Sequence, residues 1–117
     1  MPELRRQLIE TPRRMAPANL NRGAAGNLSV RAREQDEDGY LITPSGMDYD
    51  VLVPDDIVFM RLDGTADGRR KPSSEWRLHH DVYATRPEAG AVLHAHSPFA
   101  TSLACLRRDI PPFHYMI

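Results

Sequence analysis

Residues 71–98, KPSSEWRLHHDVYATRPEAGAVLHAHSP, place the sharpest helix signal of the chain next to its sharpest strand signal. Ser73 or Ser74 suits the cap of a helix that Pro87 then ends. Small and apolar residues bounded by turn formers predict a strand over 89–98. A helix followed directly by a strand favours a fold that layers both kinds of element.

Upstream of this stretch the sequence predicts strands. NLSVRA alternates apolar and polar residues and GYLITP is a second apolar run, so we expect a hairpin over 27–43 with a long charged tip at 34–39. IVFMRL, residues 57–62, predicts a further strand. Strands and helices do not alternate regularly, which argues against a Rossmann fold.

The N-terminal segment predicts an interrupted helix. Leu4 and Leu8 are spaced i, i+4, as on one face of an amphipathic helix. Pro12 and Pro17 follow, and a proline inside a helix costs about 3 kcal/mol. We therefore expect residues 1–19 to hold a broken helix.

The remaining part, residues 20–117, carries the motifs and completes what we expect to be one domain. Residues 98–107 have small and apolar side chains at near-helical spacing, which predicts a helix. Cys105 lies in that helix, and we expect it to be a buried thiol without a chemical role.

Length and composition exclude several classes of protein. The 117 residues carry a net charge of −1, so nothing marks a nucleic-acid binder. No apolar run is long enough for a transmembrane helix, and the N-terminus lacks the apolar stretch of a secretory signal. A single cysteine fits a reducing compartment, so we expect a cytoplasmic protein.

His94 and His96 form the sharpest chemical motif. Side chains at i and i+2 of a strand share a face, and two imidazoles there suit two positions of a tetrahedral zinc site. Glu75, at the start of the preceding helix, could be a further ligand or a base beside the metal. On the residues alone, packing or surface roles for the two histidines stay open.

Small polar residues gather at three junctions: Gly26-Asn27, TPSG at 43–46, and Ser73-Ser74. Hydroxyls, backbone amides and a helix N-terminus together make an anion site. Each junction alone is equally typical of a turn or a cap. Three of them in one small domain, with a candidate metal site, indicate phosphate held beside a metal.

Two further residues have less specific signals. His79 lies four residues after Glu75 and shares its helix face, so we expect either a hydrogen-bonded neighbour of the site or a packed histidine. Tyr115 lies in an apolar C-terminal run and is expected to be a core residue or an acid that reaches a site.

Taken together, the motifs resemble those of the class II aldolase/adducin family. This resemblance implies an α/β fold, a three-layer α/β/α sandwich around a mostly antiparallel sheet, which assembles as a homotetramer with active sites at subunit interfaces. It rests on GNLSVR (26–31), LITPSGMDYD (41–50), KPSSEWRLH (71–79), YATRPEAGAVLHAHSP (83–98) and IPPFHYMI (110–117).

The resemblance also implies a reaction, the metal-dependent retro-aldol cleavage of a ketose 1-phosphate such as fuculose 1-phosphate into dihydroxyacetone phosphate and an aldehyde. His94 and His96 would bind Zn²⁺ or another divalent ion. Glu75 would be the acid/base at the enediolate carbon, and Tyr115 would protonate the aldehyde oxygen at a neighbouring subunit's site. The substrate phosphate would be held by Asn27, Ser45, Gly46, Ser73 and Ser74, with Thr43 close by.

Several alternatives stay open. A sugar-phosphate epimerase or dehydratase would share the metal and phosphate sites, and an adducin-like module would keep the fold without catalysis. Family members are about twice as long, and their third zinc histidine lies beyond residue 117. We therefore expect a fold that is incomplete at its C-terminus, as in an N-terminal fragment or a decayed copy. The expected partner is a small sugar phosphate, with neither nucleic acid nor membrane.

Overall fold

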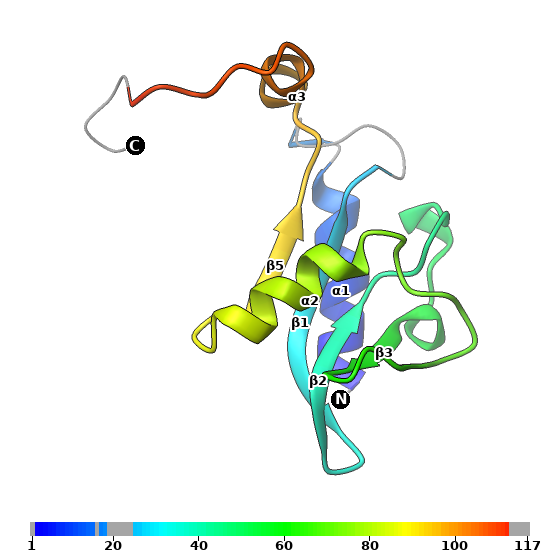
Figure 1. Cartoon of the computed structure of the whole chain (residues 1–117). Coiled ribbons are helices and arrows are strands. Elements are labelled where there is room, and N and C mark those ends of the chain that lie inside the picture. The colour runs from blue at the N-terminus through cyan, green and yellow to red at the C-terminus, as the bar shows by residue number, and fades with distance from the viewer. Residues whose placement is uncertain (1, 16, 19–24, 113–117) are drawn as a thin grey trace.

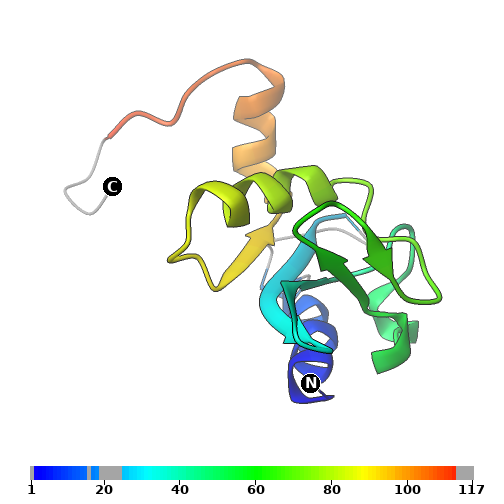
Figure 2. The ribbon, with the colours of Figure 1, turned by 60° about the horizontal axis from the view of Figure 1, so that its bottom comes forward.

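The computed structural model describes residues 2–15, 17–18 and 25–112. Its sheet has five strands in the order β4-β3-β2-β1-β5, and every pair of neighbouring strands is antiparallel. In Figure 2, β3 and the short β4 lie side by side at one edge of the sheet. The elements are α1 (Pro2–Met15), β1 (Asn27–Glu34), β2 (Glu37–Ile42), η1 (Tyr49–Val51), η2 (Pro54–Asp56), β3 (Val58–Arg61), β4 (Ala66–Asp67), α2 (Trp76–Thr85), β5 (Ala91–His94) and α3 (Pro98–Cys105).

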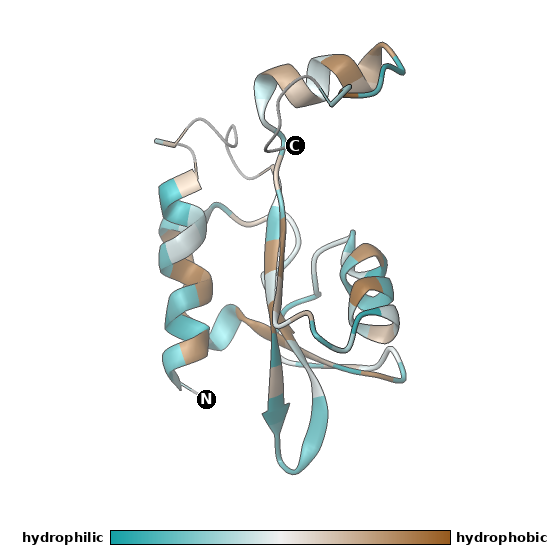
Figure 3. Cartoon of the chain, turned by 90° about the vertical axis from the view of Figure 1, so that its left-hand side faces the viewer, coloured by the Kyte–Doolittle hydropathy of each residue, from teal (hydrophilic) through white to brown (hydrophobic). Residues whose placement is uncertain are grey.

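The elements form three layers, with α1 on one face of the sheet and α2 on the other (Figures 1 and 3). Leu8 and Ile9 of α1 pack in one apolar cluster with Phe59 of the sheet. Tyr83 of α2 packs in a second cluster on the opposite face with Ile42. The expected three-layer α/β sandwich with a mostly antiparallel sheet is thus confirmed.

The middle strand β2 is covered on both faces. Tyr40, Leu41 and Ile42 are consecutive, and each is completely buried. Because neighbouring side chains on a strand point to opposite faces, Leu41 packs in the first cluster, and Tyr40 and Ile42 pack in the second. The apolar GYLITP segment therefore forms the centre of the domain, as an unbroken apolar run predicts.

The hairpin forms as expected, but its tip is tighter than the predicted loop at 34–39. Only two residues, Gln35 and Asp36, join the strands, with φ of 50° and 63°. Positive φ at both central residues matches the twist of the flanking strands, as in a type I′ turn. Gly39 therefore lies inside β2, where it passes close to the backbone of β3.

The N-terminal helix is not broken, so that prediction is wrong. Helix α1 continues through Pro12 to Met15, and both side chains are buried. Their packing offsets the missing backbone hydrogen bond of the proline. Arg13 ties down the last turn, because its Nε donates to the carbonyl oxygen of Tyr49 at 2.9 Å.

The predicted helix at 98–107 is confirmed as α3, but Cys105 is exposed rather than buried. Helix α3 lies beyond the end of the sheet and buries none of its own residues in the described part of the chain (Figure 1). Phe99 on this helix is 85% exposed. None of the described helices is long and apolar enough to cross a membrane.

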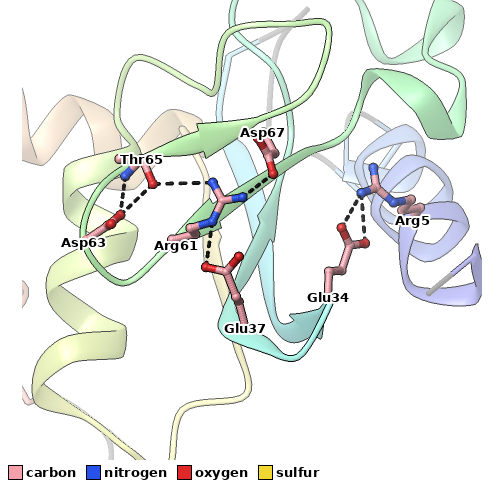
Figure 4. A network of polar contacts seen from close by, with 7 residues as sticks. All are labelled: Arg5, Glu34, Glu37, Arg61, Asp63, Thr65 and Asp67. Atoms are coloured by element: carbon pink, nitrogen blue, oxygen red, sulfur yellow. Dashed lines mark hydrogen bonds and ion pairs between the residues drawn. The ribbon is translucent and has the colours of Figure 1, made fainter.

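Ion pairs of two arginines tie α1 to the sheet and join neighbouring strands at the hairpin end of the sheet (Figure 4). Arg5 of α1 donates to both carboxylate oxygens of Glu34 at 2.9 and 3.0 Å, which ties the helix to β1. Arg61 of β3 donates to Glu37 at 2.8 Å and also pairs with Asp67 of β4. These contacts join the neighbouring strands β2, β3 and β4 through their side chains.

Gly39→Ala should destabilise the domain. A Cβ at this position would lie 2.1 Å from the carbonyl oxygen of Met60 and 2.8 Å from Cζ of Phe59. We expect a loss of about 1–3 kcal/mol or more in the free energy of unfolding, measured by urea denaturation. Gly90→Ala is the matched control, because a Cβ there meets nothing within 4 Å and should change stability by less than about 0.5 kcal/mol. Equal effects of the two substitutions would contradict the close approach.

Candidate functional site

The predicted site residues that the structure describes come together at one end of the sheet. Strands β1 and β5 lie side by side (Figure 1), and their register places Asn27 directly opposite His94. Helix α2 starts next to them, with Glu75 as the residue before its first turn, which is one position after the expected cap at Ser74 and two after the alternative at Ser73. The Ser73 hydroxyl accepts the backbone N–H of Glu75 at 3.3 Å and so supports this start.

Glu75, His94 and His96 form a compact cluster. Nδ1 of His94 lies 2.8 Å from Oε2 of Glu75, and the two imidazole centroids are 4.7 Å apart. One ligand atom from each residue lies within 4.8 Å of the other two. Strand β5 ends at His94, so His96 lies outside the strand predicted over 89–98, yet its ring stays beside that of His94.

This donor set fits a divalent cation. Within the described residues, Nδ1 of His94 is buried and makes no hydrogen bond of acceptable geometry, although the Glu75 carboxylate is close. A buried polar nitrogen without a hydrogen bond costs free energy, and a metal ion would satisfy it. Two imidazole nitrogens and one carboxylate oxygen are ligand types that zinc prefers. Glu75, His94 and His96 are therefore the residues that would hold the ion.

A polar hollow of about 220 Å³ opens next to the cluster. Two loops build it, and they are joined by hydrogen bonds from the Ser73 N–H to the Thr43 carbonyl and from the Ser45 N–H to the Lys71 carbonyl, both 3.0 Å. These bonds pair Pro44 with Pro72. The site residues that line the hollow are Asn27, Ser45, Gly46, Ser73, Ser74, Glu75 and His96.

Gly46 lines this hollow, whereas Thr43 supports it from behind. Gly46 has a φ of +67°, a conformation that favours glycine, and it lines the wall. Thr43 is buried behind the wall, where its Oγ1 accepts the N–H of Leu28 at 3.3 Å. Five of the six residues predicted to hold phosphate thus line the hollow, and Thr43 supports the loop from behind.

A hydrogen bond connects the hollow to the cluster. Nδ2 of Asn27 donates to Oε2 of Glu75 at 2.7 Å. This hydrogen bond lowers the pKa of Glu75, partial burial acts in the opposite direction, and the nearby His94 lowers the pKa further. Asn27 therefore contacts the predicted acid/base as well as lining the hollow.

Behind the site lie two polar residues that the sequence did not single out, Ser29 and Tyr83, together with His79. His79 is completely buried, with Nδ1 at 2.6 Å from the Ser29 hydroxyl and Nε2 against Oδ1 of Asn27, so it is a hydrogen-bonded neighbour of the site. The Ser29 hydroxyl lies 2.7 Å from the hydroxyl of Tyr83. Glu75, His79 and Tyr83 are spaced by four residues, so the sequence could have placed Tyr83 on the same face of α2 as the other two. Tyr115 lies outside the described residues, so its role stays a prediction.

Comparison with known proteins matches residues 6–117 to a family model described as the class II aldolase and adducin N-terminal domain. The chain is 57% identical over 114 residues to the 5-methylthioribulose-1-phosphate/5-deoxyribulose-1-phosphate aldolase of Rhodospirillum rubrum, covering 97% of this chain and 50% of that protein. It is 45% identical to the L-fuculose phosphate aldolase of Escherichia coli K12, covering 98% of this chain and 52% of that protein.

A solved structure supports the same relationship. The fold is similar to that of an L-fuculose 1-phosphate aldolase with a TM-score of 0.89 at 39% sequence identity. That similarity covers 99% of this chain and 54% of the other. The chain therefore spans about half the length of the relatives it matches.

Burial of His79 should make stability depend on pH. Burial lowers the pKa of His79 from 6.5 to about 4, the charge of His94 acts in the same direction, and Glu75 opposes both. Protonation therefore favours the unfolded chain, so the contribution of neutral His79 is complete above pH 6.5 and is lost as the pH falls towards 4. The expected loss is about 3 kcal/mol, at about 1.36 kcal/mol per pKa unit.

Urea denaturation across this pH range checks the prediction. His79→Gln removes the titrating group, and the carboxylates that also titrate there are common to both proteins. The free energy of unfolding should therefore fall more steeply in the wild type than in His79→Gln. Parallel curves would contradict a neutral buried His79.

Proposed function

The chain belongs to the class II aldolase and adducin family, and from that premise we propose that it serves in metal-dependent aldol cleavage of a ketose 1-phosphate. The products are dihydroxyacetone phosphate and an aldehyde. One observation carries the proposal: the Glu75 carboxylate lies between the histidine pair and the polar hollow, touching one through His94 and the other through Asn27. A phosphate and a reacting carbon could therefore be held on either side of one acid/base.

The hollow would take the substrate phosphate. Hydroxyls of Ser45, Ser73 and Ser74 and the amide of Asn27 converge there, and all of them can donate hydrogen bonds to phosphate oxygens. The start of α2 lies at the same place, and a helix N-terminus favours an anion. Anchoring one end of the substrate supplies the positioning that cleavage at a defined carbon needs.

Glu75 would handle the proton at carbon. In cleavage the bond between C3 and C4 breaks, the C4 hydroxyl loses its proton to become the aldehyde, and C3 gains a proton. In cleavage, Glu75 would donate the proton that C3 gains. In the direction of synthesis, Glu75 would remove a proton from C3. A divalent cation held by His94 and His96, and by Glu75 only while no substrate is bound, would supply electrostatic stabilisation of the negative charge that develops on substrate oxygen. Zn²⁺ is the ion we propose.

Two relatives suggest which substrate to test first. The relative that shares more residues is named for 5-methylthioribulose 1-phosphate and 5-deoxyribulose 1-phosphate, and the other for L-fuculose phosphate. We propose a substrate of the 5-deoxyribulose 1-phosphate type, ahead of fuculose 1-phosphate. A sugar-phosphate epimerase or dehydratase would use the same cluster, and the products distinguish them.

Exposed apolar residues in α3 and in the segment after it support assembly into an oligomer. Phe99, Leu106 and Ile110 are 85%, 68% and 55% exposed, although their side chains are large and apolar. Large apolar side chains with this much exposure are candidates for contacts with another subunit. We propose that the protein forms a tetramer in which Tyr115 acts at a neighbouring subunit's site. We also propose a cytoplasmic location. Sedimentation of the purified chain tests the tetramer.

His94→Ala and His96→Ala should each weaken zinc binding by at least about tenfold, because each removes one ligand from a cluster of three. The measurement is competition with a chromophoric chelator, together with the zinc content of the purified protein. His80→Ala is the matched control, since His80 lies on α2 outside the cluster and bonds to Tyr40 at 3.1 Å. A folded wild type that binds no zinc would exclude this metal site.

Glu75→Gln should lower cleavage by at least about 100-fold, because the amide cannot take up or return the proton. The assay is release of dihydroxyacetone phosphate from 5-deoxyribulose 1-phosphate and from fuculose 1-phosphate. The Asn27 amide can still donate to the side-chain oxygen of the introduced glutamine, so the variant should keep its fold. Full activity in Glu75→Gln, or no cleavage of either substrate by the wild type, would reject the proposed reaction for this chain.

A further inference from the structure

A line of polar side chains runs through the apolar layer between α2 and the sheet. Ser29 and His79 are completely buried, and Tyr83 is 3% exposed. The tyrosine hydroxyl meets the Ser29 hydroxyl at 2.7 Å, and that hydroxyl meets Nδ1 of His79 at 2.6 Å. Nε2 of His79 then meets Oδ1 of Asn27, whose Nδ2 reaches Glu75. The line ends at the surface of the candidate site.

Only one direction of donation satisfies every member of this line. The Glu75 carboxylate is an acceptor, so Asn27 must turn its NH₂ group towards Glu75 and its oxygen towards His79. Nε2 of His79 must then carry the hydrogen, which leaves Nδ1 of the neutral ring as an acceptor. Ser29 therefore donates to Nδ1, and the hydroxyl of Tyr83 donates to Ser29.

Asn27 joins this buried line to the phosphate hollow, because it lines the hollow itself. Its NH₂ group has two hydrogens, and the bond to Glu75 uses one of them. Among the described residues the second hydrogen has no further acceptor, so it can serve a ligand in the hollow. If the amide were turned over, its oxygen would face the Glu75 carboxylate and repel it. The orientation of one amide group thus decides both contacts.

We propose that His79, Ser29 and Tyr83 are positioning residues that hold the Asn27 amide in the one orientation serving both Glu75 and a phosphate in the hollow. The effect of this positioning on catalysis rests on the proposed function. The orientation of the Asn27 amide can be measured in the chain without any substrate. Burial makes the arrangement stable, because turning any member over would leave polar atoms unpaired away from water.

Two matched pairs of variants separate this role from ordinary packing. Tyr83→Phe removes the hydroxyl that begins the line. Tyr40→Phe removes a buried hydroxyl from a ring that stacks on Tyr83 at 4.8 Å, but this hydroxyl meets His80 and not Ser29. His79→Leu removes the donor to Asn27, whereas in His79→Gln the side-chain amide can again donate to it.

The readout that needs no activity is the side-chain amide of Asn27 in a ¹H–¹⁵N spectrum, assigned by its disappearance in Asn27→Asp. The proton held by the Glu75 carboxylate should be shifted downfield and protected from exchange. We expect His79→Leu to lose this signature, His79→Gln to restore it, and Tyr83→Phe to speed its exchange severalfold while Tyr40→Phe leaves it unchanged. Cleavage, where present, should fall in kcat by about tenfold or more in His79→Leu and recover in His79→Gln.

An unchanged Asn27 signature in both His79→Leu and Tyr83→Phe would overturn the proposal, and so would identical behaviour of Tyr83→Phe and Tyr40→Phe. If His79→Leu does not fold, the tyrosine pair alone decides. A wild type that cleaves neither ketose 1-phosphate would count against the proposed reaction, whereas the amide signature would still test the positioning role. Failure of one proposal is therefore distinguishable from failure of the other.

Discussion

The antiparallel pairing of β1 with β5 is the constraint on which the candidate site depends. This register sets Asn27 opposite His94, although the two residues are far apart in the sequence. A shift by one residue would turn every side chain of β5 to the other face and would take His94 away from Glu75. Since β5 is paired only with β1 among the described strands, this one ladder of hydrogen bonds fixes the histidine.

The two faces of the sheet serve different purposes. The cluster under α1 consists of apolar side chains such as Leu8, Leu41 and Phe59, and its contribution to stability is hydrophobic. The layer under α2 mixes apolar rings with buried Ser29 and His79. Buried polar groups specify a unique arrangement only when all of them are paired. The face under α1 is thus apolar, whereas the face under α2 combines an apolar cluster with buried polar residues next to the candidate site.

Much of this arrangement could be predicted from local sequence. The paired histidines, Glu75 four residues ahead of His79, and the serines before α2 are close in sequence, and the family they indicate is confirmed. Strand signals and the mixed layered fold followed from apolar patterns of short range. Short-range sequence patterns were sufficient to predict a feature when the residues that form it are close together in the sequence.

Other features depended on distant neighbours that no local rule contains. Pro12 is tolerated in α1 because of tertiary packing, and Gly39 is needed in a strand because of the backbone of β3. Cys105 is exposed because the described part of the chain fully buries no residue of α3. The contact between Asn27 and Glu75 required the register of β1 and the start of α2 together. In each case the presence or absence of a contact distant in sequence decides the outcome, and the sequence around the residue does not indicate it.

The backbone pairing of Pro44 with Pro72 has a consequence for how such a site can be altered. Because two hydrogen bonds join the loops, inserting or deleting a residue in either one displaces the hydroxyls of both. The two loops that line the polar hollow are therefore coupled, and a change of length in one should disturb both. A second opening of about 400 Å³ is lined by Ala25, His96, Pro98, Thr101 and Ser102, mostly from the start of α3, which packs loosely against the rest of the described chain. Substitutions at the start of α3 should accordingly reshape this second opening beside His96 and leave the pairing of the loops at 43–46 and 71–74 intact.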